Sequence, residues 1–152
     1  MSIVKSEYNN FKSIITVEDQ KDPWVMYLIV RESLNMSIGK VSAQCGHAVG
    51  LIYNYFDDLK YSMILDEEKF LEINNPTWDC IDKFNLWQKS SFRKIVKKAD
   101  DKEWEKIKQQ LECHLVIDAG LTEIPSNSET CIALWPVLKS HTPPLVKRLR
   151  LL

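Results

Sequence analysis

The stretch PWVMYLIVR (Pro23–Arg31) is a continuous apolar run rich in Val, Ile and Tyr. Such a run is typical of a β-strand that is buried on both faces of a sheet. The loop ESLNMSIGK follows, and we expect a helix from about Gly39 to Leu59. A buried strand followed by a helix indicates an α/β fold if further strands alternate with helices along the chain.

The rest of the sequence continues this alternation. Residues 92–99 (FRKIVKKA) predict a second strand, residues 114–117 a third and residues 130–137 a fourth. Between them, DDKEWEKIKQQLE has an Asp-rich start and apolar residues at Trp104, Ile107 and Leu111, which is the pattern of an amphipathic helix. We therefore predict a three-layer α/β/α fold with a mixed, roughly four-stranded sheet.

The 152 residues favour one domain. We expect residues 23–152 to form it, residues 1–22 to be an arm or an extra helix, and residues 57–91 to be an enlarged acidic connection. Short helices and loops are expected in residues 60–91. Polar residues interrupt every apolar pair near the N-terminus, and four cysteines are widely spread without a CxxC motif. These features favour a cytoplasmic protein with reduced thiols and no membrane span.

The charges are unevenly distributed although the net charge is only −1. Acidic residues dominate segment 57–82, and basic residues dominate segments 89–108 and 139–152. This distribution fits either a basic surface opposite an acidic one or two ordinary solvated faces.

Two residues in GKVSAQCGHAVG (39–50) first suggest a nucleophile and its base, namely Cys45 and His47. Positions i and i+2 of a helix are about 200° apart, so these side chains cannot form a hydrogen bond or share a metal. Cys45 lies in phase with Val41, Ala48 and Ile52, and we expect it to face the sheet as a small hydrophobic residue.

The opposite side of this helix carries Lys40, Gln44 and His47 at i, i+4 and i+7. Lys40 falls in the first turn, where free N–H groups and the positive end of the helix dipole also point. Together these groups could bind a phosphate or a developing oxyanion. The alternative is an ordinary exposed lysine on an amphipathic helix.

A second polar cluster occurs in DAGLTEI (118–124), directly after the third strand. Functional side chains in α/β sheets gather at the carboxyl ends of strands, which favours a pocket shared by Asp118 and Thr122 across a turn at Gly120. The alternative for Asp118 is an Asx turn. Lys94 lies between apolar residues of the second strand, and we expect it to pair with Asp118 on a neighbouring strand.

These motifs resemble the type-II peptidyl-tRNA hydrolases of archaea and eukaryotes. GKVSAQCGHA matches the family's G-K-x-A-A-Q-C-x-H-A, RKIVKKAD resembles its lysine-bearing strand, and IDAGLTEI resembles R-D-A-G-x-T-Q-I. CIALWP and the closing RLRLL follow in the family's order. The resemblance covers residues 24–56 and 92–152.

The chain departs from the family pattern near the expected site. Ser37 and Ile38 stand where members usually have glycine and lysine, Leu121 occupies an often basic position, and Glu123 replaces glutamine. These changes remove positive charge where RNA would approach.

The resemblance implies hydrolysis of the ester that joins a peptide to the 3′ end of tRNA, without a metal or another cofactor. It implies that Asp118 orients or deprotonates the attacking water with Thr122, that Lys40 stabilises the oxyanion, and that Lys94 keeps Asp118 ionised or neutralises the terminal phosphate. Gly39, Gln44 and His47 would line the path of the tRNA acceptor end, and Lys97 and Lys98 would bind phosphates. It also implies a homodimer and no DNA partner.

Three other functions fit parts of the sequence. A catalytically weak relative could bind tRNA or a protein partner, which the acidic connection and the missing loop lysine favour. A thiol enzyme would use Cys45, and a generic α/β domain would use the motifs only for its structure.

Overall fold

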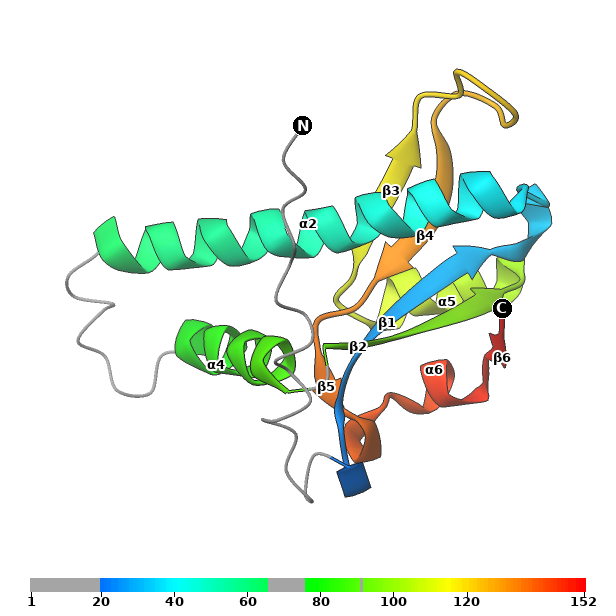
Figure 1. The fold of residues 1–152 in the computed structure, drawn as a ribbon. Helices are drawn as coiled ribbons and strands as arrows, with labels where there is room; N and C mark the ends of the chain where they lie inside the picture. The colour runs from blue at the N-terminus through cyan, green and yellow to red at the C-terminus, as the bar shows by residue number, and fades with distance from the viewer. Residues whose placement is uncertain (1–19, 66–75, 91) are drawn as a thin grey trace, which may run out of the picture.

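The computed structural model describes residues 20–65, 76–90 and 92–152 (Figure 1). Its strands are β1 (Trp24–Arg31), β2 (Arg93–Ala99), β3 (His114–Asp118), β4 (Ser128–Ala133), β5 (Val137–Leu138) and β6 (Arg150–Leu151). Its α-helices are α2 (Ile38–Leu65), α4 (Pro76–Lys89), α5 (Asp101–Gln110) and α6 (Pro144–Arg148), and two 3₁₀ turns are η2 (Glu32–Leu34) and η3 (Lys139–His141). The predicted N-terminal arm falls almost entirely outside the described residues.

The strands form one mixed sheet in the order β3-β4-β1-β2-β6, with β5 paired to β1. Strand β1 pairs in parallel with β2 and antiparallel with β4, and β4 pairs antiparallel with β3. The four predicted strands are therefore confirmed, and two strands of two residues each are added. Because β3 has the same direction as β1 and β2, the carboxyl ends of all three lie at one edge of the sheet.

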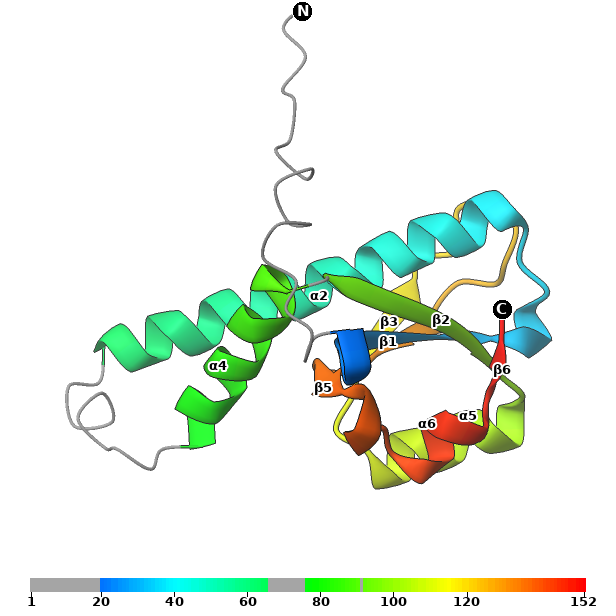
Figure 2. The same cartoon turned by 60° about the horizontal axis from the view of Figure 1, so that its bottom comes forward.

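Helices cover both faces of the sheet, which confirms the α/β/α prediction. Figure 2 shows α2 and α4 on one side and α5 and α6 on the other. The central strand β1 contributes to both cores: Met26, Leu28 and Val30 face α2 and α4, whereas Val25, Tyr27 and Ile29 face α5 and α6. These residues are at most 3% exposed, as expected for a strand that is apolar on both faces.

Helix α2 is longer than its predicted range, because it continues to Leu65. Its buried stripe of Ala48, Ile52, Phe56 and Met63 extends past the sheet. The first half of α2 packs on β3, β4 and β1, and the helix also packs against α4.

Helix α4 lies within the segment predicted to contain short helices and loops. The buried residues Phe84 and Trp87 attach it to the core, and the ring of Phe84 stacks on Phe56 of α2 with 4.0 Å between centroids. Helix α4 has 14 residues, and this aromatic contact buries the apolar side chains that hold it against α2.

Helix α5 begins where the sequence predicted. The Asp100 side chain accepts a hydrogen bond from Glu103 N, and the Glu103 side chain accepts one from Asp100 N, so the two residues form a capping box. Trp104 and Ile107 are buried under the sheet, which confirms the amphipathic pattern.

Candidate active site

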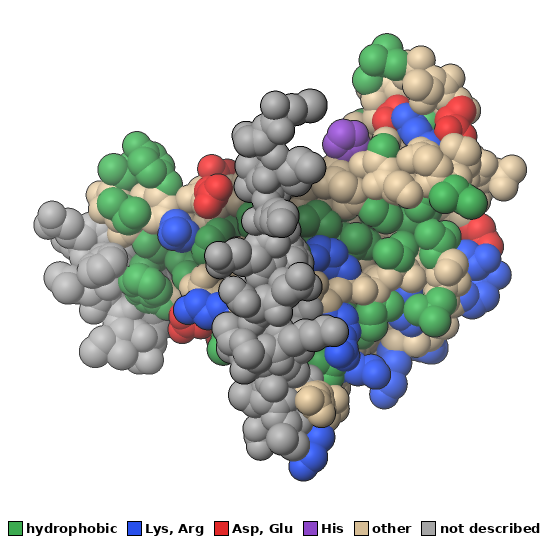
Figure 3. All heavy atoms as spheres, in the orientation of Figure 1, with side chains coloured by type: hydrophobic (Ala, Val, Ile, Leu, Met, Phe, Trp, Pro, Cys, Tyr) green, Lys and Arg blue, Asp and Glu red, His purple; other side chains and the backbone are tan. Residues whose placement is uncertain are grey.

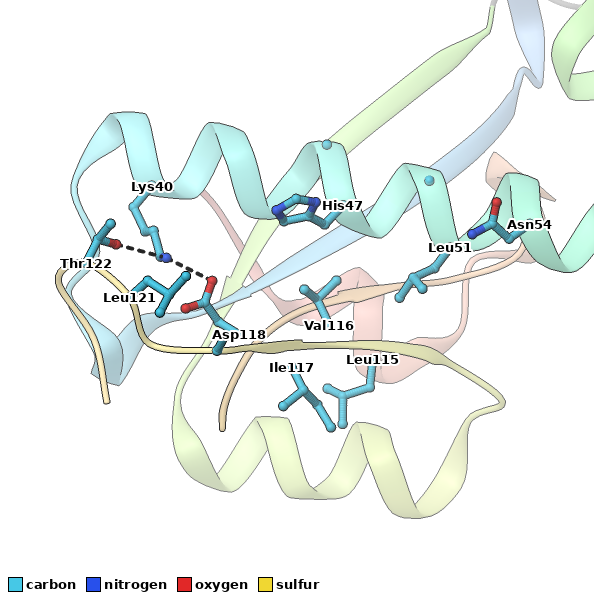
Figure 4. A pocket seen from close by; sticks show the side chains of 13 residues that line it. Lys40, His47, Leu51, Asn54, Leu115, Val116, Ile117, Asp118, Leu121 and Thr122 are labelled. Carbon is cyan, nitrogen blue, oxygen red and sulfur yellow. Dashed lines mark hydrogen bonds and ion pairs between the residues drawn. The ribbon is translucent and has the colours of Figure 1, made fainter. Parts of the chain in front are cut away.

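The candidate site lies where the first turn of α2 meets the carboxyl end of β3 (Figure 4). The topology brings these elements together: α2 starts shortly after the end of β1, and β3 ends at the same edge of the sheet. Lys40 Nζ donates to Asp118 Oδ2 over 2.8 Å and to Thr122 Oγ1 over 3.1 Å. The predicted grouping of Asp118 with Thr122 is confirmed, and Lys40 is the cation that joins them.

Three donors surround the carboxylate of Asp118. Lys40 and Gln44 both donate to Oδ2, the latter over 2.7 Å, and the backbone N–H of Gly120 donates to Oδ1 over 2.7 Å. These hydrogen bonds, led by that of Lys40, lower the pKa of Asp118. The side chain is therefore an anion at neutral pH and a weak proton acceptor.

The ion pair is largely shielded from water. The side chains of Lys40 and Asp118 are 11% and 12% exposed. Among the described residues, two of the three ammonium N–H groups of Lys40 are directed at Asp118 and Thr122. The third N–H is left for a further acceptor such as a substrate. A shielded ammonium beside a helix N-terminus suits an oxyanion or a phosphate oxygen.

Gln44 is buried rather than lining the exposed side of the helix, which corrects the expectation that it borders a substrate path. It is 1% exposed, and it shares the side of the helix that carries Lys40. Its amide nitrogen donates to Asp118, and its amide oxygen accepts from the buried Thr130 hydroxyl over 2.6 Å. Gln44 thus fixes the orientation of the carboxylate.

Thr130 is a residue of the site that the sequence patterns did not predict. The pairing of β3 with β4 shifts from Val116–Cys131 to Ile117–Glu129, so Thr130 has no partner residue in β3. This bulge directs the Thr130 hydroxyl toward Gln44. No local sequence signal distinguishes a bulge from a regular strand here.

The turn after β3 holds Thr122 and Asp118 together. Gly120 has a φ of +73°, and a Cβ there would lie 2.3 Å from Ser126 N, so only glycine fits. The N–H of Asn127 donates to the carbonyl of Asp118 over 2.8 Å and closes the loop. The predicted turn at Gly120 is confirmed, and the Asx-turn contact of Asp118 coexists with its ion pair.

Glu123 fastens the same loop to the start of α2. Its carboxylate accepts from Ser37 N over 2.9 Å and from Ser37 Oγ over 2.6 Å, and Ser37 Oγ accepts from Lys40 N over 3.2 Å. The Ser37 donors lower the pKa of Glu123. In the sequence, Ser37 and Glu123 are only departures that remove positive charge. In the structure, Ser37 donates two hydrogen bonds to the Glu123 carboxylate, at a helix N-terminus that favours an anion.

A groove of about 700 Å³ opens beside the ion pair. Figure 4 shows it between the exposed side of α2, with His47, Leu51 and Asn54, and the strand β3. His47 is exposed at this groove, whereas Cys45 is half-buried and packs against the core. The predicted separation of Cys45 from His47 is confirmed.

Lys94 lies far from Asp118, so the predicted pairing of these two residues is wrong. Strands β4 and β1 separate β2 from β3, and Lys94 is near the start of β2 rather than its carboxyl end. At about 4.8 Å per strand and 3.3 Å per residue, the offset is on the order of 20 Å. Lys94 Nζ instead donates to Phe92 O over 3.0 Å and lies 4.9 Å from the ring centroid of Trp87.

The other basic residues named from the sequence are engaged with the protein itself. Lys97 Nζ donates to the carbonyl of Leu149 over 2.7 Å, and Lys98 pairs with Glu32 over 3.0 Å. Gly39 is exposed in the first turn of α2, one residue before Lys40. Among the described residues, no three His, Cys, Asp or Glu side chains converge as metal ligands, and no helix is long and apolar enough to cross a membrane.

The fold and site together define an α/β protein with a lysine–aspartate pair at the carboxyl edge of a mixed sheet. A family model described as Peptidyl-tRNA hydrolase PTH2 matches residues 24–152. The chain belongs to this family.

Named relatives agree with the family match. A Drosophila melanogaster protein named probable peptidyl-tRNA hydrolase 2 is 28% identical over 138 residues, which cover 86% of this chain and 63% of the relative. A Dictyostelium discoideum protein of the same name is 30% identical, with 82% of this chain and 52% of the relative covered. A Pyrobaculum aerophilum peptidyl-tRNA hydrolase is 32% identical, with 73% and 82% covered. The chain thus spans less than two thirds of the two eukaryotic relatives.

The environment of Lys94 leads to a prediction about stability. Burial lowers the pKa of Lys94 from 10.5 to about 8. The unfolded chain therefore binds the proton more tightly between pH 8 and 10.5, and the free energy of unfolding should rise with pH in that window. Lys94→Met should be more stable than the wild type at pH 7, and the difference should shrink toward pH 10.5.

Urea denaturation at pH 7, 8.5 and 10 measures this difference. Lys83→Met is the matched control, because Lys83 forms an i,i+4 pair with Asp79 on the surface of α4. A Lys94→Met protein that is less stable at pH 7 would show that the aromatic rings and the carbonyl of Phe92 stabilise the ammonium by more than burial costs.

Proposed function

We propose that this chain hydrolyses the ester between a peptide and the 3′ end of tRNA, releasing the peptide and free tRNA. Membership of the peptidyl-tRNA hydrolase family supports this function. The observation that carries it is the contact of Lys40 with both Asp118 and Thr122 at the mouth of a groove. An ester hydrolase needs a positioned water and a cation at the carbonyl oxygen, and these side chains provide for both.

In the proposed reaction, a water oxygen attacks the ester carbonyl and forms the new carbon–oxygen bond. The carbonyl oxygen gains negative charge, and the free N–H of the Lys40 ammonium stabilises it. The bond to the ribose oxygen then breaks, this oxygen takes the proton released by the water, and the peptide leaves as an acid. All steps use side chains of the chain and water.

The lowered pKa of Asp118 favours one of its two expected roles. A carboxylate that binds protons weakly is a poor general base near neutral pH. Asp118 therefore orients the water and keeps Lys40 in place, rather than removing a full proton early. Thr122 accepts a hydrogen bond from Lys40, so its own O–H can hold the same water.

Gln44 and His47 take different parts in this mechanism. Gln44 is a positioning residue, because it reaches the reaction only through the carboxylate of Asp118. His47 is exposed in the groove and can contact the substrate directly. Gly39 leaves the first turn of α2 open one residue before Lys40, since no atom lies within 4 Å of a Cβ built there.

We further propose that tRNA phosphates contact the basic surface around β2 and the C-terminal segment. Lys and Arg side chains gather there on the face shown in Figure 3. Arg93, Lys147 and Arg148 are exposed in this region, whereas Lys97 and Lys98 are occupied by contacts within the chain. Lys97 and Lys98 would bind phosphate only by giving up these contacts. A cytoplasmic location and a single domain of residues 23–152 are parts of the same proposal.

Lys40→Met and Asp118→Asn should each lower kcat/KM about 100- to 1,000-fold, because each removes a charge that acts at the reacting carbonyl. The assay is single-turnover hydrolysis of an N-acetylated aminoacyl-tRNA. Lys83→Met is the control, since it removes a lysine from a surface ion pair on α4. Rates within threefold of the wild type for either site variant would refute the assignment.

We also propose that the chain forms a homodimer through α2. Val41, Cys45 and Val49 are half-buried apolar residues at i, i+4 and i+8, and Figure 3 shows apolar side chains along this flank of α2. Sedimentation equilibrium should give twice the 17.8 kDa mass of one chain. A single-chain mass at the concentrations used for activity assays would contradict the dimer.

A further inference from the structure

We propose that the groove between α2 and β3 binds the peptide part of the substrate as an extended strand that pairs with β3. This inference rests on the proposed hydrolysis of peptidyl-tRNA and adds the chemistry by which the peptide is recognised. The occupant is an uncharged polypeptide segment that ends at the scissile carbonyl. Three features of the described residues lead to it: the open edge of β3, the shape of the groove, and its lack of cations.

Strand β3 is at the end of the sheet order, and its side away from β4 has no strand partner among the described residues. An open strand edge presents backbone N–H and C=O groups that can pair with an added strand. The side chain of Ile117 is 60% exposed beside this edge. An added peptide would gain main-chain hydrogen bonds whatever its sequence, which suits an enzyme that must accept many peptides.

The groove has the length of a short peptide and starts at the ion pair. It is lined along α2 from Lys40 to Asn54, which is about 21 Å at 1.5 Å per residue. An extended chain rises about 3.3 Å per residue, so roughly six residues fit. Asp118 is the last residue of β3, and a peptide whose carboxyl end is at Asp118 runs parallel to β3.

Two glycines keep the groove open on the side of α2. Gly46 and Gly50 are exposed, one turn apart, and no atom lies within 4 Å of a Cβ built on either. Glycine inside a helix costs about 1 kcal/mol relative to alanine, so two of them in open space are unfavourable for folding alone. They allow another backbone to approach α2 closely.

The charges of the groove favour a peptide over the RNA end of the substrate. Lys40 is the one lysine or arginine among the lining residues in the described part of the chain, and it is paired with Asp118. Leu51 and Val116 lie between α2 and β3 in Figure 4 and make this part of the wall apolar. Phosphates bind through lysine and arginine, so a groove without free cations suits a neutral chain better.

The test measures how kcat/KM depends on peptide length. Full-length protein is assayed with tRNA that carries an N-acetylated chain of one, two, four, six or eight neutral residues. We expect kcat/KM to rise about tenfold or more between one and six residues and then to level off, once the five residues of β3 are paired and the groove is filled. A kcat/KM that is independent of length would overturn the proposal.

Variants at Gly50 give a graded test of the same groove. The quantity compared is the ratio of kcat/KM for the six-residue substrate to kcat/KM for the one-residue substrate. Gly50→Ala should keep most of this advantage, and Gly50→Leu should reduce it to less than about threefold by filling the groove. Gln109→Leu adds the same side chain at an exposed position of α5 and should retain the full advantage. Thermal melts confirm folding, and an unchanged advantage in Gly50→Leu would refute the model.

A binding measurement separates this proposal from the proposed function. An N-acetylated hexapeptide acid added to isotope-labelled wild-type protein should shift the backbone amide signals of residues 115–118 and of Gly46 and Gly50. If a single-stranded RNA trinucleotide shifts these signals and the peptide does not, the groove binds RNA and the proposal fails. If the protein hydrolyses no substrate, the proposed function fails, while the peptide titration still decides what the groove binds.

Discussion

The ion pair between Lys40 and Asp118 is the interaction on which the rest of the site depends. It joins the first turn of α2 to the last residue of β3 across a 2.8 Å contact that is nearly closed to water. Charges in such a position are costly unless further hydrogen bonds satisfy them. Gln44 and the backbone of Gly120 donate further hydrogen bonds to the Asp118 carboxylate, and Thr122 accepts a hydrogen bond from the Lys40 ammonium.

The surrounding structure holds both partners of this pair from several sides. Glu123 and Ser37 fasten the loop after β3 to the start of α2. The bulge at Thr130 anchors Gln44 from the sheet. A site that is fixed from a helix, a loop and a strand needs little rearrangement when charge develops at the reacting carbonyl, which is the main requirement of electrostatic catalysis.

The sequence predicted the layers, the four main strands, a lysine in the first turn of a helix as an anion-binding group, and a pocket shared by Asp118 and Thr122. These features follow from local patterns: Pro23–Arg31 is apolar on both faces, and Asp118 comes directly after a strand. The partner assigned to Asp118 was wrong because the strand order is not local. The alternation of side chains along β2 does not reveal that β4 and β1 lie between Lys94 and Asp118.

Two further features of the site depend on tertiary structure. Gln44 and His47 both lie on the side of α2 that carries Lys40. Only the position of the sheet determines that Gln44 is buried and that His47 is open to the groove. Thr130 reaches Gln44 only through the bulge in β4. Likewise, Ser37 and Glu123 are 86 residues apart, so each looks like an isolated change until the fold brings them together.

Lys40 and Asp118 act as one unit in this site, and a double-mutant cycle on kcat/KM tests this most directly. Wild type, Lys40→Met, Asp118→Asn and the double variant are compared in single-turnover hydrolysis of the same blocked aminoacyl-tRNA. Side chains that act together are strongly non-additive, so the double variant should be no more than about threefold slower than the slower single variant. Losses that multiply in the double variant would contradict the account.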